Sequence, residues 1–139
     1  MNARDVATAG LVGLGGGLGA LARYGADLVW PWRPPEFPLA TLTVNFVGSL
    51  AIGALLVVLL EGPARSWWVR PLLAVGLVGG FTTFSAFAVE TVRLVDGAAA
   101  GLAATYVVLS LALGLAAVWS SATMTRRIVV GRPPQPDRG

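Results

Sequence analysis

The chain has 139 residues, of which 55% are hydrophobic and only 12% are charged, with a formal net charge of +3. Its mean hydropathy of +0.73 lies outside the range of ordinary soluble domains and predicts an all-α membrane protein. Because the chain has no cysteine and no histidine, it excludes disulfides, thiolate metal sites and conventional metalloenzyme chemistry, and we expect no enzyme.

Four charge-free runs approach or exceed the roughly 20 residues that cross a bilayer; they cover residues 6–22, 37–60, 71–89 and 97–124. They predict one four-helix transmembrane domain over residues 1–124, with spans at about 6–24, 37–60, 71–91 and 98–122. Residues 125–139 hold four arginines and three prolines, and we expect a flexible tail there.

The first predicted span carries a surface of small residues, namely Gly13, Gly15, Gly16, Gly17, Gly19 and Ala20. Such a surface lets a second helix approach closely, and we favour helix packing over a ligand site. Arg23 follows at the span boundary, where a guanidinium reaches the interface, pairs with an acid or caps the carbonyls of a broken helix. We favour a structural pairing for Arg23.

In the second predicted span, polar and small residues interrupt an apolar run. At about 100° per residue, one helix face holds Thr41, Asn45, Gly48 and Ser49. An asparagine amide within a membrane needs partners. It either joins two helices or donates hydrogen bonds to an anion, and the sequence leaves both interpretations open.

The third predicted span contains residues 79–87, which read Gly-Gly-Phe-Thr-Thr-Phe-Ser-Ala-Phe. Paired glycines and paired threonines are poor material for a lipid-facing helix. Irregular backbone at membrane depth is tolerated where it is buried in protein or lines a wet cavity. We therefore predict a third helix that is broken mid-membrane, whose carbonyls could bind a cation and whose amides could bind an anion.

Two aromatic residues and an acid follow the predicted break. Phe84 and Phe87 share a helix face; they either pack in the core or turn their electropositive ring edges toward an anion. We expect Glu90 to pair with Arg23 or Arg93.

The fourth predicted span places Tyr106, Ser110 and Gly114 on one face at intervals of four residues. Together with Thr41 and Asn45, these hydroxyls would form a ladder of neutral donors, which suits removal of water from a small ion without trapping it.

The basic residues are scattered at the ends of the spans. Outside the tail, each side of the membrane is expected to have three arginines. One side has Arg4, Arg65 and Arg70, and the other has Arg23, Arg33 and Arg93. This balance gives the spans little preference for direction, so insertion in both orientations is expected. No basic stripe is present, and we expect no binding of nucleic acid.

In order and spacing, these motifs resemble the CrcB/Fluc family of fluoride channels over all four spans. The resemblance rests on Gly16-Gly-Leu-Gly-Ala-Leu-Ala-Arg-Tyr24, Thr41-Leu-Thr-Val-Asn-Phe-Val-Gly-Ser49, residues 79–87 with Glu90, and Tyr106 with Ser110. It implies an antiparallel, dual-topology homodimer in the lipid bilayer, with two fluoride pores and a central structural sodium ion.

The resemblance also implies roles for individual residues. The carbonyls of Gly79 and Thr82 would bind sodium, and Phe84 and Phe87 would line the pore. Asn45 would contact fluoride, and the polar track would contain Thr41, Tyr106 and Ser110. Arg23 and Glu90 would be entrance or structural residues. Many members continue the stripe with another serine where this chain has Gly114.

The expected function is passive export of cytoplasmic fluoride across a bacterial inner membrane, which lowers fluoride toxicity. A small multidrug-type exporter is one alternative, but such a protein needs a carboxylate in its first span, and residues 6–22 have none. A non-transporting membrane assembly protein is the other. In that case the glycines would only pack helices, and the third span would only be kinked.

Overall fold

The computed structural model describes residues 2–62, 66–129 and 131. The regular elements of this part of the chain are the helices α1 (Ala3–Val29), α2 (Leu39–Leu60), η1 (Arg70–Val78), α3 (Gly79–Phe81), α4 (Phe84–Asp96) and α5 (Ala100–Val129). Four helical segments are long and apolar enough to cross a membrane, namely Ala3–Val29, Leu39–Leu60, Arg70–Asp96 and Ala100–Val129. The chain is therefore an all-helical, multi-pass membrane protein.

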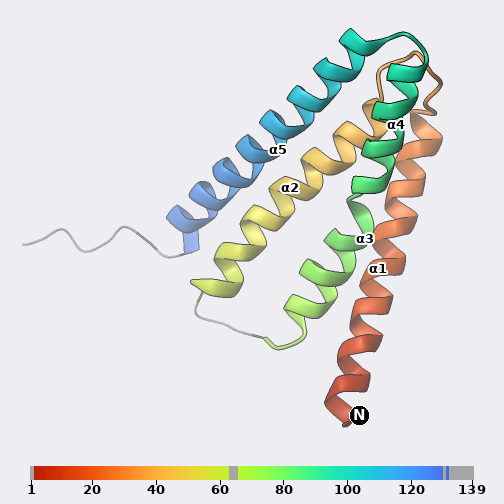
Figure 1. Ribbon diagram of the computed structural model, residues 1–139. Helices are drawn as coiled ribbons and strands as arrows, with labels where there is room; N and C mark the ends of the chain where they lie inside the picture. The colour runs from red at the N-terminus through yellow and green to blue at the C-terminus, as the bar shows by residue number, and fades with distance from the viewer. Residues whose placement is uncertain (1, 63–65, 130, 132–139) are drawn as a thin grey trace, which may run out of the picture.

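The four spans lie side by side and alternate in direction (Figure 1). α5 packs along α2, while α1 packs against η1 and α3. The third span, drawn in green, thus lies between α2 and α1 (Figure 1). This arrangement brings the polar face of α2 toward the threonines that follow α3.

Helix α1 begins and ends outside the predicted range of 6–24. Its first turn is closed by a capping box, in which Asn2 Oδ1 accepts from the Asp5 amide at 3.0 Å and Asp5 Oδ2 accepts from the Asn2 amide at 3.0 Å. A cap satisfies the free amides at a helix start with polar side chains. The apolar run alone therefore underestimates the length of this helix.

The glycines of α1 pack against the third span, as the small-residue surface predicted. Gly15 and Gly19 are buried. A Cβ atom on Gly15 would collide with the Leu72 carbonyl, and one on Gly19 would collide with the Leu77 carbonyl. Only residues without a side chain allow backbones to approach this closely.

Gly15→Ala is expected to destabilise the protein, because the added methyl group would meet backbone atoms that cannot rotate away. Overpacking of this kind typically costs about 1–3 kcal/mol. Gly13→Ala is the matched control on the same helix, because a Cβ there has no heavy atom within 4 Å. Thermal denaturation in detergent should show a lower midpoint for Gly15→Ala alone; equal midpoints would contradict the packing role of Gly15.

Helix α5 continues beyond residue 122, the predicted end of the fourth span, to Val129. Arg126 forms a bidentate ion pair with Glu61, with Nε 2.7 Å from Oε2 and one terminal nitrogen 2.6 Å from Oε1. The Arg126 hydrogen bond holds the pKa of the Glu61 carboxyl below its ordinary value. Residues 125–129 of the predicted tail are thus helical, and residues 132–139 lie outside the described residues.

Candidate functional site

The helical backbone of the third span is interrupted at two threonines. Thr82 and Thr83 have extended backbone, with φ/ψ of −75°/157° and −147°/121°. The Thr82 hydroxyl donates to the Val78 carbonyl at 2.9 Å and so closes the preceding turn. The Thr83 hydroxyl accepts from the Ala86 amide at 3.1 Å and caps the start of α4. β-Branched residues suit extended backbone, and here their hydroxyls also satisfy both helix ends.

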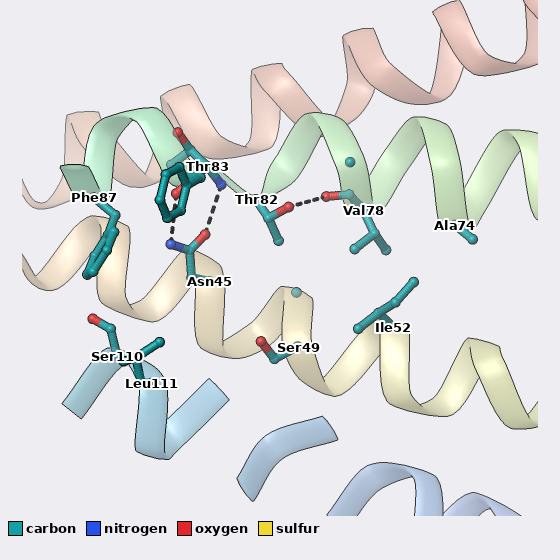
Figure 2. Close-up of a pocket in the computed structure, with 13 residues that line it drawn as sticks. Asn45, Ser49, Ile52, Ala74, Val78, Thr82, Thr83, Phe87, Ser110 and Leu111 are labelled. Atoms are coloured by element: carbon teal, nitrogen blue, oxygen red, sulfur yellow. Dashed lines mark hydrogen bonds between the residues drawn. The ribbon is translucent and has the colours of Figure 1, made fainter. Parts of the chain in front are cut away.

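Asn45 on α2 binds the backbone of this interruption at two points (Figure 2). Its Oδ1 accepts from the Thr83 amide at 2.8 Å, and its Nδ2 donates to the Thr83 carbonyl at 2.9 Å. In an unbroken helix, the Thr83 amide would donate to the carbonyl of Gly79, four residues earlier. Asn45 takes this donor instead, so the Gly79 carbonyl loses its helical partner.

The two interpretations of Asn45 are therefore compatible, because its side chain has enough hydrogen-bonding groups for both. The amide joins α2 to the third span, as the helix-packing interpretation predicts. However, Nδ2 carries two hydrogens, and the Thr83 carbonyl accepts one of them. The second hydrogen is available to a water molecule or an anion.

A buried hydrogen-bonded cluster joins three spans at Glu90. Thr41 Oγ1 donates to Glu90 Oε1, and the Tyr106 hydroxyl donates to Glu90 Oε2, each at 2.7 Å. Thr41 is 3% exposed, Tyr106 is fully buried and Glu90 is 9% exposed. Burial without such partners would be costly for a carboxyl group, so we assign this cluster (Thr41, Glu90 and Tyr106, called the Glu90 cluster below) a structural role at least.

The expected pairing of Glu90 with Arg23 or Arg93 is wrong for the described part of the chain. Both Glu90 oxygens accept from hydroxyls, while Arg93 is exposed on α4. Arg23 instead donates from Nε to the Gly80 carbonyl at 3.4 Å. Its guanidinium thus contacts a carbonyl at the end of a helix. Capping such a carbonyl was one of the three roles expected for an arginine at the span boundary.

A row of aromatic rings runs from the interruption to the Glu90 cluster. The ring centroids of Phe84 and Phe87 are 5.8 Å apart, and those of Phe87 and Tyr106 are 5.3 Å apart. Phe37 continues the row with an edge-to-face contact on Tyr106 at 5.6 Å. At the other end, the Phe84 side chain is 79% exposed. A large apolar ring is therefore left on the surface beside the interruption.

A cavity of about 480 Å³ opens beside the interruption. Its lining comes from the second, third and fourth spans and consists of Asn45, Gly48, Ser49, Ile52, Ala74, Val78, Gly79, Thr82, Thr83, Phe84, Phe87, Ser110 and Leu111 (Figure 2). The Ser110 hydroxyl oxygen is buried and has no hydrogen-bond partner among the described residues. An unsatisfied buried hydroxyl costs free energy, so a water molecule or another polar group beside Ser110 would be stabilising.

The structure brings most of the predicted site residues to this cavity, including Asn45, Gly79, Thr82, Phe84, Phe87 and Ser110. Thr41 and Tyr106 lie in the neighbouring Glu90 cluster instead. Sequence reasoning did not assign Ser49 or Thr83 to the site, although Ser49 lies one helical turn after Asn45. Thr83 contributes through its backbone amide and carbonyl, for which a side-chain pattern has no signal.

Comparison with known proteins decides the family. A model of the family described as "CrcB-like protein, Camphor Resistance (CrcB)" matches residues 10–122. The chain belongs to this family. The CrcB match runs from within α1 to within α5 and includes every residue of the cavity and of the Glu90 cluster.

Several curated proteins called "Fluoride-specific ion channel FluC" are similar to this CrcB-family chain over most of its length. The Paracoccus denitrificans protein is 44% identical over 115 residues, which are 83% of this chain and 91% of the relative. "Fluoride-specific ion channel FluC 1" of Mycobacterium bovis is 43% identical, and the Saccharophagus degradans protein is 39% identical; each match covers 85% of this chain and 89% of the relative. These relatives are channels, which confirms that the family is not an enzyme family.

Proposed function

We propose that this protein is a fluoride-selective channel of the bacterial inner membrane. Cytoplasmic fluoride would leave passively down its electrochemical gradient, which lowers its toxicity. One observation carries the proposal: the Asn45 amide, the unpartnered Ser110 hydroxyl and the Phe84 and Phe87 rings line the same cavity. The relatives named as fluoride-specific channels support fluoride as the ion for these donors.

The chemistry of the cavity suits a small, strongly hydrated anion. Among the described residues that line it, none is ionisable. Neutral hydrogen-bond donors replace the water lost by the ion without binding it so tightly that it cannot leave. The second Nδ2 hydrogen of Asn45 and the Ser110 hydroxyl would supply such donors, and the electropositive edges of Phe84 and Phe87 would line the path between them.

The Glu90 cluster would extend this path as a polar track. The hydroxyls of Thr41 and Tyr106 donate to Glu90, and a hydroxyl has one hydrogen to donate. Either hydroxyl therefore serves fluoride only when it turns away from the carboxyl group. Phe87 lines the cavity and contacts Tyr106, which supports an exchange of this kind next to the cavity.

A sodium ion would bind where the third span is broken mid-membrane. Interrupted helices expose carbonyls that coordinate sodium in membrane proteins. The Gly79 carbonyl fits this role, because Asn45 withdraws its helical donor, and the extended Thr82 supplies a second carbonyl. When bound, sodium would supply positive charge that fixes these carbonyls in place. Two carbonyls do not complete a coordination shell, which favours a central position between two copies.

A dual-topology homodimer, the assembly that we propose, would also account for exposed groups at the interruption. Phe84 is 79% exposed, and Gly79 is exposed beside it. A second, antiparallel copy would cover both and would place the two cavities on either side of the sodium ion. Each copy would then have its own fluoride path.

The deciding experiment is anion efflux from liposomes that contain the purified chain alone. We expect rapid loss of fluoride, retention of chloride and no dependence on a proton gradient. A multidrug-type exporter would need the proton gradient, and an assembly protein would release neither anion. A dimeric preparation that passes no fluoride would overturn the channel proposal.

Phe84→Ile should slow fluoride efflux about tenfold, because an aliphatic side chain keeps the apolar volume but lacks the electropositive ring edge. Phe46→Ile on α2 is the matched control, since Phe46 does not line the cavity. The liposome assay and a cross-linking measurement of the dimer check both variants. If Phe84→Ile conducts like the control, the ring edge has no role in permeation.

Ser49 would supply the hydroxyl that the family resemblance led us to expect from a serine at the Gly114 position. A Cβ atom on Gly114 would lie 3.5 Å from Ser49 Oγ, which is ordinary contact. Ser49→Ala should therefore slow efflux severalfold through loss of one hydroxyl, and adding Gly114→Ser should restore it. Ser120→Ala is the control, because Ser120 is an exposed residue whose hydroxyl donates to the Ala117 carbonyl of its own helix. If Gly114→Ser does not restore efflux to Ser49→Ala, a hydroxyl at position 114 cannot replace the one of Ser49, and the proposal for Ser49 is contradicted.

A further inference from the structure

A second cavity of about 570 Å³ lies at one end of the bundle. It is formed near the start of α1, the end of α2 and the start of η1, which lie at the same end (Figure 1). Its lining consists of Arg4, Ile52, Leu56, Leu59, Leu60, Ser66, Trp67, Arg70, Ala74 and Val75. The proposed fluoride path does not use its charged and leucine-rich part.

The two parts of this lining differ sharply in chemistry. The polar groups Arg4, Ser66 and Arg70 come from the ends of the spans, together with Trp67. The guanidinium carbon of Arg4 lies 5.8 Å from the centroid of the Trp67 ring, within cation–π range. The remaining lining residues are aliphatic and come from within α2 and η1. The cavity is thus cationic at the membrane boundary and apolar toward the membrane interior.

In the part of the chain that the structure describes, neither Arg4 nor Arg70 forms an ion pair with a nearby acid. Asp5 is held in the capping box with Asn2. Glu61 is paired with Arg126 of α5. Arg4 and Arg70 are both exposed at this rim. Two guanidinium groups without a described acidic partner favour an anionic ligand.

We propose that this cavity binds an anionic phospholipid, with its phosphate between Arg4 and Arg70 and one acyl chain against the leucines. Guanidinium groups match phosphate oxygens through paired N–H donors. Tryptophans such as Trp67 prefer the level of the headgroups. Inorganic phosphate would use only the cationic rim, and the apolar wall from Ile52 to Leu60 specifically favours a ligand with a hydrocarbon chain.

Intact-complex mass spectrometry of the full-length protein tests this proposal without using ion flux. The protein in detergent is titrated with phosphatidylglycerol, and bound lipids are counted on the monomer and dimer peaks. We expect the double variant Arg4→Gln/Arg70→Gln to bind this lipid roughly thirtyfold more weakly. The charge-matched control is Arg33→Gln/Arg93→Gln, which removes two exposed arginines near the other end of the bundle.

Four comparisons decide the outcome. The unmodified protein should retain phosphatidylglycerol in preference to zwitterionic phosphatidylcholine, a result that does not depend on any variant. Inorganic phosphate at the same concentration should not displace the lipid. The proposal would be overturned if the protein retained both lipids equally or if phosphate displaced the lipid. It would also be overturned if the two double variants bound the lipid equally, or if the dimer peak lost its lipid because a second copy fills the cavity.

Discussion

Asn45→Asp is expected to slow fluoride efflux by at least about a hundredfold. The substitution keeps the shape of the side chain but removes the Nδ2 donor and adds negative charge beside the proposed path. A like charge about 4 Å away costs about 4 kcal/mol at an effective dielectric constant of 20, and each 1.4 kcal/mol corresponds to a factor of ten. Repulsion of the anion therefore dominates the expected effect.

Asn45→Asp also affects the fold at the interruption. The Thr83 carbonyl would lose the donor that now lies at 2.9 Å, while the Thr83 amide would keep an acceptor. An unsatisfied carbonyl costs about 1–3 kcal/mol, so a lower denaturation midpoint should accompany the slower flux.

The matched control is Asn2→Asp, because Asn2 is the other asparagine of the chain. Aspartate caps helix starts about as well as asparagine does, so α1 should keep its first turn. Efflux is measured at equal protein density in liposomes, with the dimer fraction measured in parallel. If Asn45→Asp remains dimeric and conducts at the unmodified rate, Asn45 does not contact the ion.

The positions of the four spans could be predicted from sequence because absence of charge over a bilayer thickness is a local property. Their ends could not, because ends depend on caps and on tertiary pairs. Asn2 and Asp5 extend α1 beyond its apolar run. Arg126 lies in the part of α5 beyond the predicted end and forms an ion pair with Glu61, which is distant in sequence.

The site residues were likewise predictable where the signal lies within one helix, and not where it depends on contacts between helices. The helical period correctly placed Asn45 and Ser49 on one face of α2, and both line the cavity. The partners of Glu90 were missed because opposite charge favoured an arginine, whereas packing of three spans brings Thr41 and Tyr106 to the carboxyl group. Sequence pattern reports which groups share a face of one helix. It does not report which helix that face meets.

Tyr106→Phe separates a structural role of the Glu90 cluster from a role in permeation. The variant keeps the ring between Phe37 and Phe87 and removes only the hydroxyl. Loss of one buried hydrogen bond to the carboxyl group should cost about 1–3 kcal/mol and lower the denaturation midpoint by several degrees. If the hydroxyl also belongs to the polar track, fluoride efflux should fall about tenfold.

A double-mutant cycle with Glu90→Gln tests whether these groups act together. Glutamine offers one acceptor oxygen where the two hydroxyls now find one each, so Glu90→Gln alone should also destabilise the fold. Adding it to Tyr106→Phe should cost less than the sum of the two changes, with a coupling of about 1 kcal/mol.

Thr105→Val is the control for Tyr106→Phe, because the neighbouring Thr105 hydroxyl is exposed and donates to the Gly101 carbonyl of its own helix. Additive effects of Tyr106→Phe and Glu90→Gln would show that the carboxyl group does not organise the hydroxyls. A lower midpoint with unchanged efflux in Tyr106→Phe would restrict the cluster to stability. The fluoride path would then be limited to Asn45, Ser110 and the phenylalanine edges, because the cavity they line does not require the hydroxyls that Glu90 holds.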